Sequence, residues 1–424
     1  MTHALPISDP TPRARAGGPG RTAADAGSRW IWPTILFAAL IVRLAFVFVV
    51  PQVIVWTDGR EYDEMARHLV DHGTYGLRAL RAPGYPTLMA AAYLVFGKSL
   101  LALRLVEAIL GTVTVGLLGV VGARLFGRRA GLIAAALMAL HPVLAFLPVT
   151  EYSETTVVLV IALGLGAAFE GWRRGGWWRW AASGLFFGVA TLVRPNVVLM
   201  WPGLALGFMA ALLRERRGWL TPLLVASVAL GLAVAPWLIR SHQVHGRWFF
   251  VASGGGRSFW LGNNPWTDCV TWKYTQPDSA TLAEASRQPD EFALDNYYYR
   301  RGMEFVRDHP ARAARLYGVK LANLFALYPE PYTKRFVNAW ARWSQGLASV
   351  VVFAGALLSL RRWRARPELW PLLASILTFS LVNAVYYSVL RYRMAIEPCL
   401  LLMAGLGWAS LWERRPWRPR DGVG

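Results

Sequence analysis

The feature that most constrains the fold of this chain is a series of apolar runs long enough to cross a lipid bilayer. A spanning helix needs about 20 mostly apolar residues, because it rises about 1.5 Å per residue through a hydrocarbon core of about 30 Å. Hydrophobic residues make up 55% of the 424 residues and charged residues only 17%, whereas soluble domains carry about 25% charged residues. The sequence therefore predicts an all-α polytopic membrane protein.

Ten apolar runs divide the chain into spans and connecting segments. The predicted spans are 30–51, 102–121, 130–147, 155–169, 180–193, 197–213, 220–239, 347–360, 369–387 and 394–411. The predicted parts are a cytoplasmic tail (1–29), a transmembrane catalytic core (30–239) with a first outer loop (52–99), a modest outer segment (240–346), the last transmembrane helices (347–411) and a second cytoplasmic tail (412–424). We expect the first tail to be disordered, because it is rich in Pro, Gly, Ala and Arg and lacks an apolar core.

The arginines predict how the spans are oriented. The net charge is +20, and much of it lies in short segments between spans: "ARLFGRR", "GWRRGGWWRW", "RERRG", "RRWRAR" and "ERRPWRPR". Basic loops favour the cytoplasm, so this pattern indicates membrane topology rather than nucleic-acid binding. All five segments lie in the cytoplasm together with both termini only if the apolar stretch 85–97 does not cross the membrane. As a helix this stretch is about 20 Å long, too short to cross.

We therefore expect 85–97 to be a re-entrant or interfacial helix on the outer face of the plasma (inner) membrane. The basic stretch 311–329 is also expected to lie along the interface. The outer face would then hold 52–99, the corner at 148–154, the turn at Arg194, the segment 240–346 and the "LRYRM" turn. The predicted cytoplasmic loops are short and cannot cradle a nucleotide, so we expect any chemistry on the periplasmic or exterior side.

The stretch "VWTDGREYDEMARHL" (55–69) places four acidic side chains just beyond the first span. Tyr62, Met65, Ala66 and Leu69 recur at helical spacing, which predicts an amphipathic helix lying on the outer surface. Asp58 precedes that helix. Its carboxylate would either cap the helix or act as a general base or orienting group at the membrane boundary.

Further charged residues are predicted to converge on the same face from different spans. An isolated cation at a span end is usually an interfacial snorkelling side chain, but several guanidiniums beside carboxylates suit an anionic lipid headgroup next to an acid–base pair. These residues are Arg104, Glu151, Glu154, Arg194, Arg240, Arg391 and Arg393. Inside the first two spans, Arg43 and Glu107 are expected to form a structural ion pair, because an unpaired cation there is costly.

Three weaker patterns concern metals, disulfides and phosphate loops. Glu64, His68 and His72 recur at helical spacing, so their side chains could together ligate a divalent metal. A solvent-exposed helix face explains the same residues equally well. No cofactor is predicted. Cys269 and Cys399 lie in a loop and in a span, so no disulfide is expected. The glycine-rich "SGGGRSFWLGNNP" precedes no helix signal, which favours a hairpin or a loop at the substrate edge over a P-loop.

The order of the short motifs resembles a known family. The motifs are "DGREY", "RAPGYP", "SET", "LVRP", "APWLIRSH", "SGGGRSFWLGNNP" and "RYRMAIEP". Over about 30–411 they are similar to bacterial relatives of dolichyl-phosphate-mannose protein mannosyltransferases and of lipid A aminoarabinose transferases. These are integral-membrane glycosyltransferases of the C-type superfamily.

The resemblance implies a hexosyl or pentosyl transferase that uses a polyprenyl-phosphate sugar donor, with inverting transfer to a glycan, lipid or protein acceptor on the non-cytoplasmic face. It implies Asp58 as the base and Glu154, or the nearby Glu151, as the second acid. Family members often carry a second acid directly after the first; here Gly59 stands there, and Glu61 is the alternative. The implied binders of the donor phosphate are Arg104, Arg194, Arg240 and Arg391, and the implied substrate contacts are Glu61, Tyr62, Arg81, Tyr85, Asn263 and Asn264.

Two other functions compete with this hypothesis. A transporter or flippase of lipid-linked sugars would favour inverted repeats and polar residues at mid-membrane. Here the polar residues crowd one predicted face and no repeat is evident. A non-catalytic membrane scaffold would not need Asp58. For the transferase hypothesis, one carboxylate is sufficient as base if cationic groups bind the phosphate, because lipid phosphate is a good leaving group.

Overall fold

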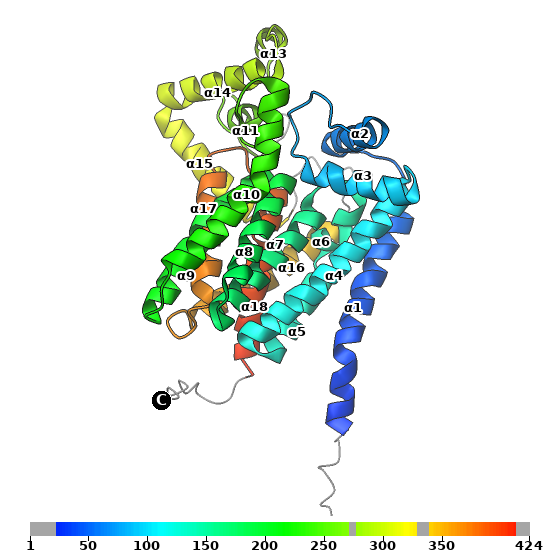
Figure 1. Cartoon of the computed structure of the whole chain (residues 1–424), viewed down its shortest axis with the longest axis vertical. Coiled ribbons are helices and arrows are strands. Elements are labelled where there is room, and N and C mark those ends of the chain that lie inside the picture. The colour runs from blue at the N-terminus through cyan, green and yellow to red at the C-terminus, as the bar shows by residue number, and fades with distance from the viewer. Residues whose placement is uncertain (1–22, 271–276, 329–338, 413–424) are drawn as a thin grey trace, which may run out of the picture.

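The computed structural model describes residues 23–270, 277–328 and 339–412, and every regular element in these ranges is a helix. Figure 1 shows long helices packed side by side, with shorter helices gathered at one end of the bundle. The predicted all-α architecture is therefore confirmed. Residues 1–22 and 413–424 of the predicted tails lie outside the described residues. Helix α1 begins at Ala23, so the end of the predicted first tail is helical.

The bundle and its end are formed by different sets of helices. The bundle contains α1 (Ala23–Val49), α4 (Leu100–Phe126), α5 (Arg128–Leu140), α6 (Pro142–Phe146), η1 (Leu147–Val149), α7 (Glu154–Arg174), α8 (Trp177–Val193), η2 (Pro195–Leu199), α9 (Met200–Arg214), α10 (Leu220–His245), α16 (Ala339–Leu360), α17 (Leu369–Asn383) and α18 (Glu397–Ser410). The end is built from α2 (Thr57–His72), α3 (Gly84–Phe96), α11 (Gly255–Leu261), α13 (Ser279–Ser286), α14 (Glu291–Asp308), α15 (Pro310–Leu324) and η4 (Leu390–Ala395).

The predicted number of ten spans is not confirmed. Each predicted run coincides with helix, but only six helical stretches in the described ranges are long and apolar enough to cross, or seven if α5 and the bent α6–η1 segment count as one. The break between those two is bent by 59°. Helix α17 has 15 residues and α18 has 14, which gives each a length of roughly 20 Å, shorter than the hydrocarbon core.

Small residues allow some of the bundle helices to approach very closely. A Cβ atom added to Gly184 on α8 would overlap the carbonyl oxygen of Ala226 on α10, and one added to Gly407 on α18 would overlap that of Gly355 on α16. Close backbone contact of this kind is typical of helix packing in membranes, where van der Waals contact replaces the hydrophobic effect as the driving force. These glycines therefore set the spacing of two helix pairs.

The short helices α2 and α3 lie across the bundle end rather than along the bundle. In Figure 1, α3 crosses over α4. Helix α2 is seen nearly end-on in the same view. Helix α3 occupies the stretch predicted to be re-entrant or interfacial. The predicted apolar face of α2 is also present, since Tyr62, Met65 and Ala66 are buried.

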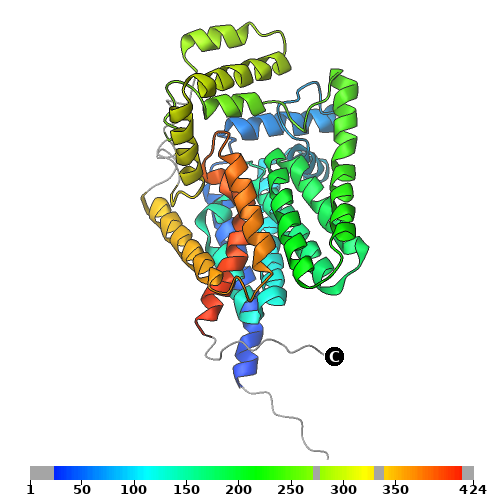
Figure 2. The same ribbon diagram turned by 90° about the vertical axis from the view of Figure 1, so that its left-hand side faces the viewer.

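The segment 240–346 is mostly helical in its described part. Figures 1 and 2 place α11, α13 and α14 at the same end as α2 and α3. The hairpin or loop expected for "SGGGRSFWLGNNP" is wrong, because α11 begins at Gly255 inside that motif. Gly254 supplies the left-handed turn before it, with φ 106°, a conformation that glycine adopts without strain. Cys269 and Cys399 are both buried and unbridged.

Candidate active site

Asp58 lies in the first turn of α2, and arginines bind both of its carboxylate oxygens. Oδ1 accepts from Nη2 of Arg81 at 2.6 Å and Oδ2 from Nη2 of Arg391 at 2.8 Å. The N-cap residue of α2 is Trp56, with no capping hydrogen bond from its side chain. The capping alternative for Asp58 is therefore wrong. The carboxylate faces a cluster of arginines instead.

Arg81 binds Asp58 and also a second acid on the same helix, Glu61. Its Nε lies 2.5 Å from Oε2 of Glu61, and its guanidinium lies 5.6 Å from the ring centre of Tyr62. Glu61 is three residues after Asp58, so both carboxylates project from one side of α2 toward the arginine. This places three predicted substrate-contact residues, Glu61, Tyr62 and Arg81, beside Asp58.

Arg391 connects Asp58 to Glu154 at the start of α7. Its Nε lies 3.3 Å from Oε1 of Glu154, which also accepts a hydrogen bond from Arg194. The Arg391 guanidinium stacks 4.0 Å from the ring centre of Tyr152. Arg391 comes from the η4 turn and Arg194 from the end of α8. We define the arginine–carboxylate cluster as Asp58, Glu61, Arg81, Glu154, Arg194 and Arg391.

The electrostatics of this cluster keep Asp58 ionised. Burial alone would raise the pKa of Asp58, but the guanidiniums of Arg391 and Arg81 outweigh burial and hold that pKa well below its usual range. Burial raises the pKa of the Tyr62 hydroxyl, which stays protonated. Three guanidiniums face three carboxylates, so the cluster is charge-balanced as it stands.

Glu151 and Arg104 form a separate pair. Arg104 Nε lies 2.6 Å from Glu151 Oε1, and each side chain is only 1% exposed. The other nitrogens of Arg104 donate to the carbonyl groups of Val50, Pro51 and Val53, at 2.9 to 3.3 Å. Arg104 therefore connects Glu151 to the segment of chain that follows α1. Glu154, not Glu151, is the acid that reaches the cluster.

Arg240 and Tyr85 also lie outside the cluster. Arg240 donates to the carbonyl oxygen of Gly76 at 2.8 Å and stacks on Trp237, 4.9 Å from its ring centre. Tyr85 is fully buried behind Tyr62, with ring centres 5.1 Å apart. Arg240 therefore holds the loop after α2, and Tyr85 supports Tyr62 from behind.

Asn263 and Asn264 hold the segment after α11 in place by hydrogen bonds. Asn263 donates to the carbonyl groups of Phe259 and Val385 at 2.8 and 2.9 Å and accepts from Lys320 Nζ at 3.0 Å. Asn264 accepts from the backbone N–H of Thr267 at 2.8 Å. Both side chains are buried, so their observed contacts are within the protein.

The expected ion pair between Arg43 and Glu107 is not among the ion pairs of the described residues. Arg43 donates to the carbonyl oxygen of Ala39 in its own helix at 2.9 Å, and Glu107 accepts from the Thr156 hydroxyl at 3.0 Å. Each side chain finds a nearer partner, one in its own helix and one on α7. Sequence position along a span does not fix which neighbouring helix a side chain faces.

The helical pattern Glu64, His68 and His72 does not assemble a metal site. Glu64 pairs with Arg78 at 2.8 Å, and the imidazoles of His68 and His72 stack with ring centres 4.4 Å apart. Within the described ranges, no group of three His, Cys, Asp or Glu side chains has the arrangement of a metal site.

Sequence reasoning missed the aromatic residues that support the arginines. Tyr392 lies under Arg194, with 4.7 Å from guanidinium to ring centre, and Tyr152 lies under Arg391. Each tyrosine is the direct neighbour of a residue already singled out, in "TEYSE" and "LRYRM". Aromatic residues beside arginines and acids at a membrane boundary were the available signal.

Residues 80–239 match the family of dolichyl-phosphate-mannose-protein mannosyltransferases. The resemblance drawn from the motifs is thereby confirmed over this segment. The matched residues include Arg81, Glu154 and Arg194 of the cluster, whereas Asp58 and Arg391 fall on either side of them. No protein with curated annotation matches the sequence.

Solved structures share the helical architecture. The oligosaccharyltransferase of Archaeoglobus fulgidus in the apo form is 14% identical, with a TM-score of 0.54 over 92% of this chain and 51% of that one. The same enzyme tethered to an acceptor peptide gives 16% identity and 0.52, over 91% and 50%. ArnT from Cupriavidus metallidurans bound to undecaprenyl phosphate gives 16% and 0.44, over 91% and 79%. This chain thus spans about half the length of the archaeal enzyme and has its fold there.

Proposed function

We propose that this protein transfers a sugar from a polyprenyl-phosphate donor to an acceptor nucleophile on the non-cytoplasmic face of the plasma membrane. The observation that carries the proposal is the arginine–carboxylate cluster, in which Arg391 joins Asp58 and Glu154 at one end of an apolar bundle. The matching family is named for a lipid-phosphate-linked sugar donor, which supports the donor class.

The charge balance of the cluster suggests how the donor engages it. Arg391 divides its guanidinium between Asp58 and Glu154, and Arg81 divides its own between Asp58 and Glu61. An added phosphate must compete with these carboxylates for a guanidinium, and arginine binds phosphate in the same forked geometry. Arg391 and Arg194 are the proposed phosphate ligands.

This competition would also activate the base. An ionised aspartate paired with two guanidiniums is a weak proton acceptor, because its pKa lies far below the operating pH. When the donor phosphate draws Arg391 away, the pKa of Asp58 rises and the carboxylate becomes free to accept a proton. The donor is therefore expected to bind before the acceptor reacts.

The proposed chemical step is a single displacement at the anomeric carbon. The acceptor oxygen forms a bond to that carbon while its proton passes to Asp58, and the bond from the anomeric carbon to the phosphate oxygen breaks. The electron pair leaves with the lipid phosphate, whose charge the guanidiniums stabilise. Attack opposite to the leaving group inverts the configuration of the sugar.

The lipid tail needs an apolar path beside the cluster, and a groove between α15 and α17 offers one. Its volume is about 380 Å³, and its lining residues are Gly318, Leu321, Ala322, Phe325, Ile376, Leu377, Ser380 and Leu381. Helix α15 also packs against η4, the turn that carries Arg391. A polyprenyl chain in this groove would leave its phosphate near that turn.

The experiment uses a strain that lacks the protein, complemented with wild type or with Asp58→Asn. Mass spectrometry of the cell-envelope glycans should show a product that wild type restores and Asp58→Asn does not, with equal protein in the membrane. Asp71→Asn is the matched control, because Asp71 lies on the same helix but pairs only at the surface with Lys98. Full restoration of the product by Asp58→Asn would remove Asp58 from the mechanism.

A further inference from the structure

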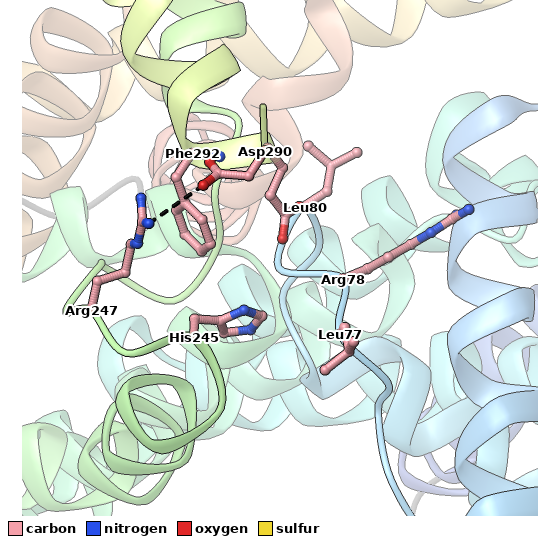
Figure 3. Close-up of a pocket in the computed structure, with 8 residues that line it drawn as sticks. Leu77, Arg78, Leu80, His245, Arg247, Asp290 and Phe292 are labelled. Atoms are coloured by element: carbon pink, nitrogen blue, oxygen red, sulfur yellow. Dashed lines mark hydrogen bonds and ion pairs between the residues drawn. The ribbon is translucent and has the colours of Figure 1, made fainter. Parts of the chain in front are cut away.

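A second cavity opens beside the loop that carries Arg81. Its volume is about 550 Å³, within the range typical of small-ligand sites. The lining residues, most of which are labelled in Figure 3, are Leu77, Arg78, Leu80, His245, Arg247, Asp290, Glu291 and Phe292. They come from the loop between α2 and α3, the end of α10 and the start of α14. We call this space the α14 cavity.

The wall of the α14 cavity is continuous with the arginine–carboxylate cluster. The backbone N–H of Ala79 donates to Glu291 at 2.8 Å, and the carbonyl oxygen of Ala79 accepts from the backbone N–H of Ser253 at 2.8 Å. Ser253 also donates its hydroxyl to Glu291 at 3.3 Å. Arg81 follows two residues later, at most about 7 Å along the chain. The loop that lines the cavity is therefore the same loop that brings Arg81 to Asp58.

The charged groups of the cavity already have partners. Arg247 lies 3.4 Å from Asp290, whose other oxygen caps α14 by accepting from the N–H groups of Phe292 and Ala293. Figure 3 shows Arg78 extending away from His245 and Phe292. Its guanidinium pairs with Glu64 of α2 at 2.8 Å. Both guanidiniums at this cavity are therefore paired with carboxylates, as those of the cluster are.

The floor of the cavity is aromatic. The rings of His245 and Phe292 have centres 5.3 Å apart, and both rings contact Phe249, at 5.5 and 4.8 Å. The guanidinium of Arg247 covers Phe292 at 4.8 Å. Nε2 of His245 has no hydrogen-bond partner among the described residues. The cavity therefore presents the aromatic rings of His245 and Phe292 next to a guanidinium group and an imidazole nitrogen without a partner among the described residues.

We propose that the α14 cavity binds a sugar ring of the acceptor, so that the acceptor is a glycan. A pyranose presents a C–H face that packs on aromatic rings, and hydroxyl groups that bond to imidazole, carboxylate and guanidinium groups. A lipid tail would require a lining without these charges. An extended peptide often pairs with the edge of a sheet, and every regular element in the described residues is a helix. The inference rests on the proposed transferase function.

The test compares four variants in the deletion strain supplied with isotopically labelled sugar. Phe292→Leu removes the aromatic face and keeps an apolar side chain, and His245→Phe keeps a ring and removes the nitrogen. Trp248→Leu is the matched control, because Trp248 is an exposed ring that stacks on His242 outside the cavity lining. Asp58→Asn reports on the transferase itself. Product is measured in the separated glycan, glycolipid and protein fractions, per amount of variant in the membrane.

We expect labelled product in a glycan or glycolipid fraction, lowered about tenfold or more by Phe292→Leu and by His245→Phe and unchanged by Trp248→Leu. Normal product from both cavity variants, or product carried on protein, would overturn the inference. If Asp58→Asn abolishes product while the cavity variants do not, only the cavity assignment fails. If Asp58→Asn leaves the product intact, the transferase proposal itself fails.

Discussion

At the scale of the residue, the ionisation of Asp58 is set by its neighbours. Its side chain is about three-quarters buried, and burial by itself would raise its pKa. Arg391 and Arg81 reverse that direction, so the folded pKa lies below the ordinary value of 3.8. These pairs therefore contribute their full stability above that value and lose it as the pH falls through the lower, folded pKa. Around neutral pH their contribution does not change.

Arg391→Gln should reveal this control directly. Burial raises the pKa of Asp58, and Arg391 is the guanidinium that opposes this most, so the pKa of Asp58 should rise when Arg391 is replaced. Hydrophobic carbodiimides modify protonated carboxyl groups, so Asp58 should resist modification in wild type between about pH 5 and pH 7 and become reactive in the variant at the acidic end. Peptide mass spectrometry measures the modified fraction. Equal reactivity of Asp58 in both proteins would show that Arg391 does not control its ionisation.

Arg391→Lys tests the forked contact rather than the charge. A single ammonium group cannot reproduce the two separate nitrogens that reach Asp58 and Glu154. We expect transfer to fall about 10- to 100-fold, which corresponds to about 1.4 to 2.7 kcal/mol, when product formation is followed in membranes. Arg124→Lys is the control, because Arg124 is an exposed residue paired with Glu170 away from the cluster. An unimpaired Arg391→Lys would contradict a forked role.

At the scale of the element, the η4 turn is held in place by a buried polar network. Arg393 pairs with Glu397 at 3.0 Å and donates to the carbonyl oxygen of Ala326 and the hydroxyl of Ser349, at 2.8 and 3.1 Å. Arg391 lies on the same turn, two residues before Arg393. The network therefore anchors the turn that delivers Arg391 to Asp58.

His141 completes this network without adding a charge. Its Nδ1 accepts from the backbone N–H of Leu144 at 3.3 Å, at the break between α5 and α6. The ring proton is therefore assigned to Nε2, which lies 3.3 Å from Glu397. Arg393 supplies the positive charge that pairs with Glu397.

Glu397→Gln should destabilise the protein, because it leaves Arg393 buried without a countercharge. Breaking a buried pair from one side costs about 3 to 5 kcal/mol, whereas replacing both partners by apolar residues is often neutral. Thermal unfolding in detergent should therefore occur at lower temperature for Glu397→Gln and recover in Arg393→Met/Glu397→Met. If the single variant were as stable as wild type, the anchoring role of this pair would be wrong.

At the scale of the whole molecule, the arginine–carboxylate cluster and the arginine-rich segments lie at opposite ends of the bundle. Helix α7 begins with Glu154 in the cluster and ends at Arg174, about 30 Å away along its axis. Trp177 follows at that far end, among the arginine-rich segments. Helix α14 lies at the cluster end (Figure 1). From the positive-inside rule we propose that the far end faces the cytoplasm.

Single cysteines should report that orientation. Trp177 and Met303 are 71% and 58% exposed, at the far end and on α14 respectively, and both native cysteines are buried. A membrane-impermeant maleimide added to intact cells should label Met303→Cys and leave Trp177→Cys unlabelled until the cells are opened. The reverse pattern would place the cluster in the cytoplasm and remove the basis of the proposed donor.

The long helices of the bundle could be predicted from sequence, because apolar runs and helical periodicity are local properties. The short helix α11 could not, since its glycine-rich start carries no helix signal. The sequence also singled out Asp58, Glu154 and Arg391 as charged residues at the ends of apolar runs. It did not determine the number of spans, since short helices such as α17 and α18 have the composition of a span without its length.

Which charges meet depends on how the helices pack. Asp58 and Arg391 are 333 residues apart in the chain, and no local pattern distinguishes Arg391, which reaches Asp58, from Arg104, which pairs with Glu151. The same holds for Glu154 and Glu151, three residues apart but in different environments. The partner of a charge depends on the direction in which each helix turns its side chains after packing, and periodicity alone does not contain that direction.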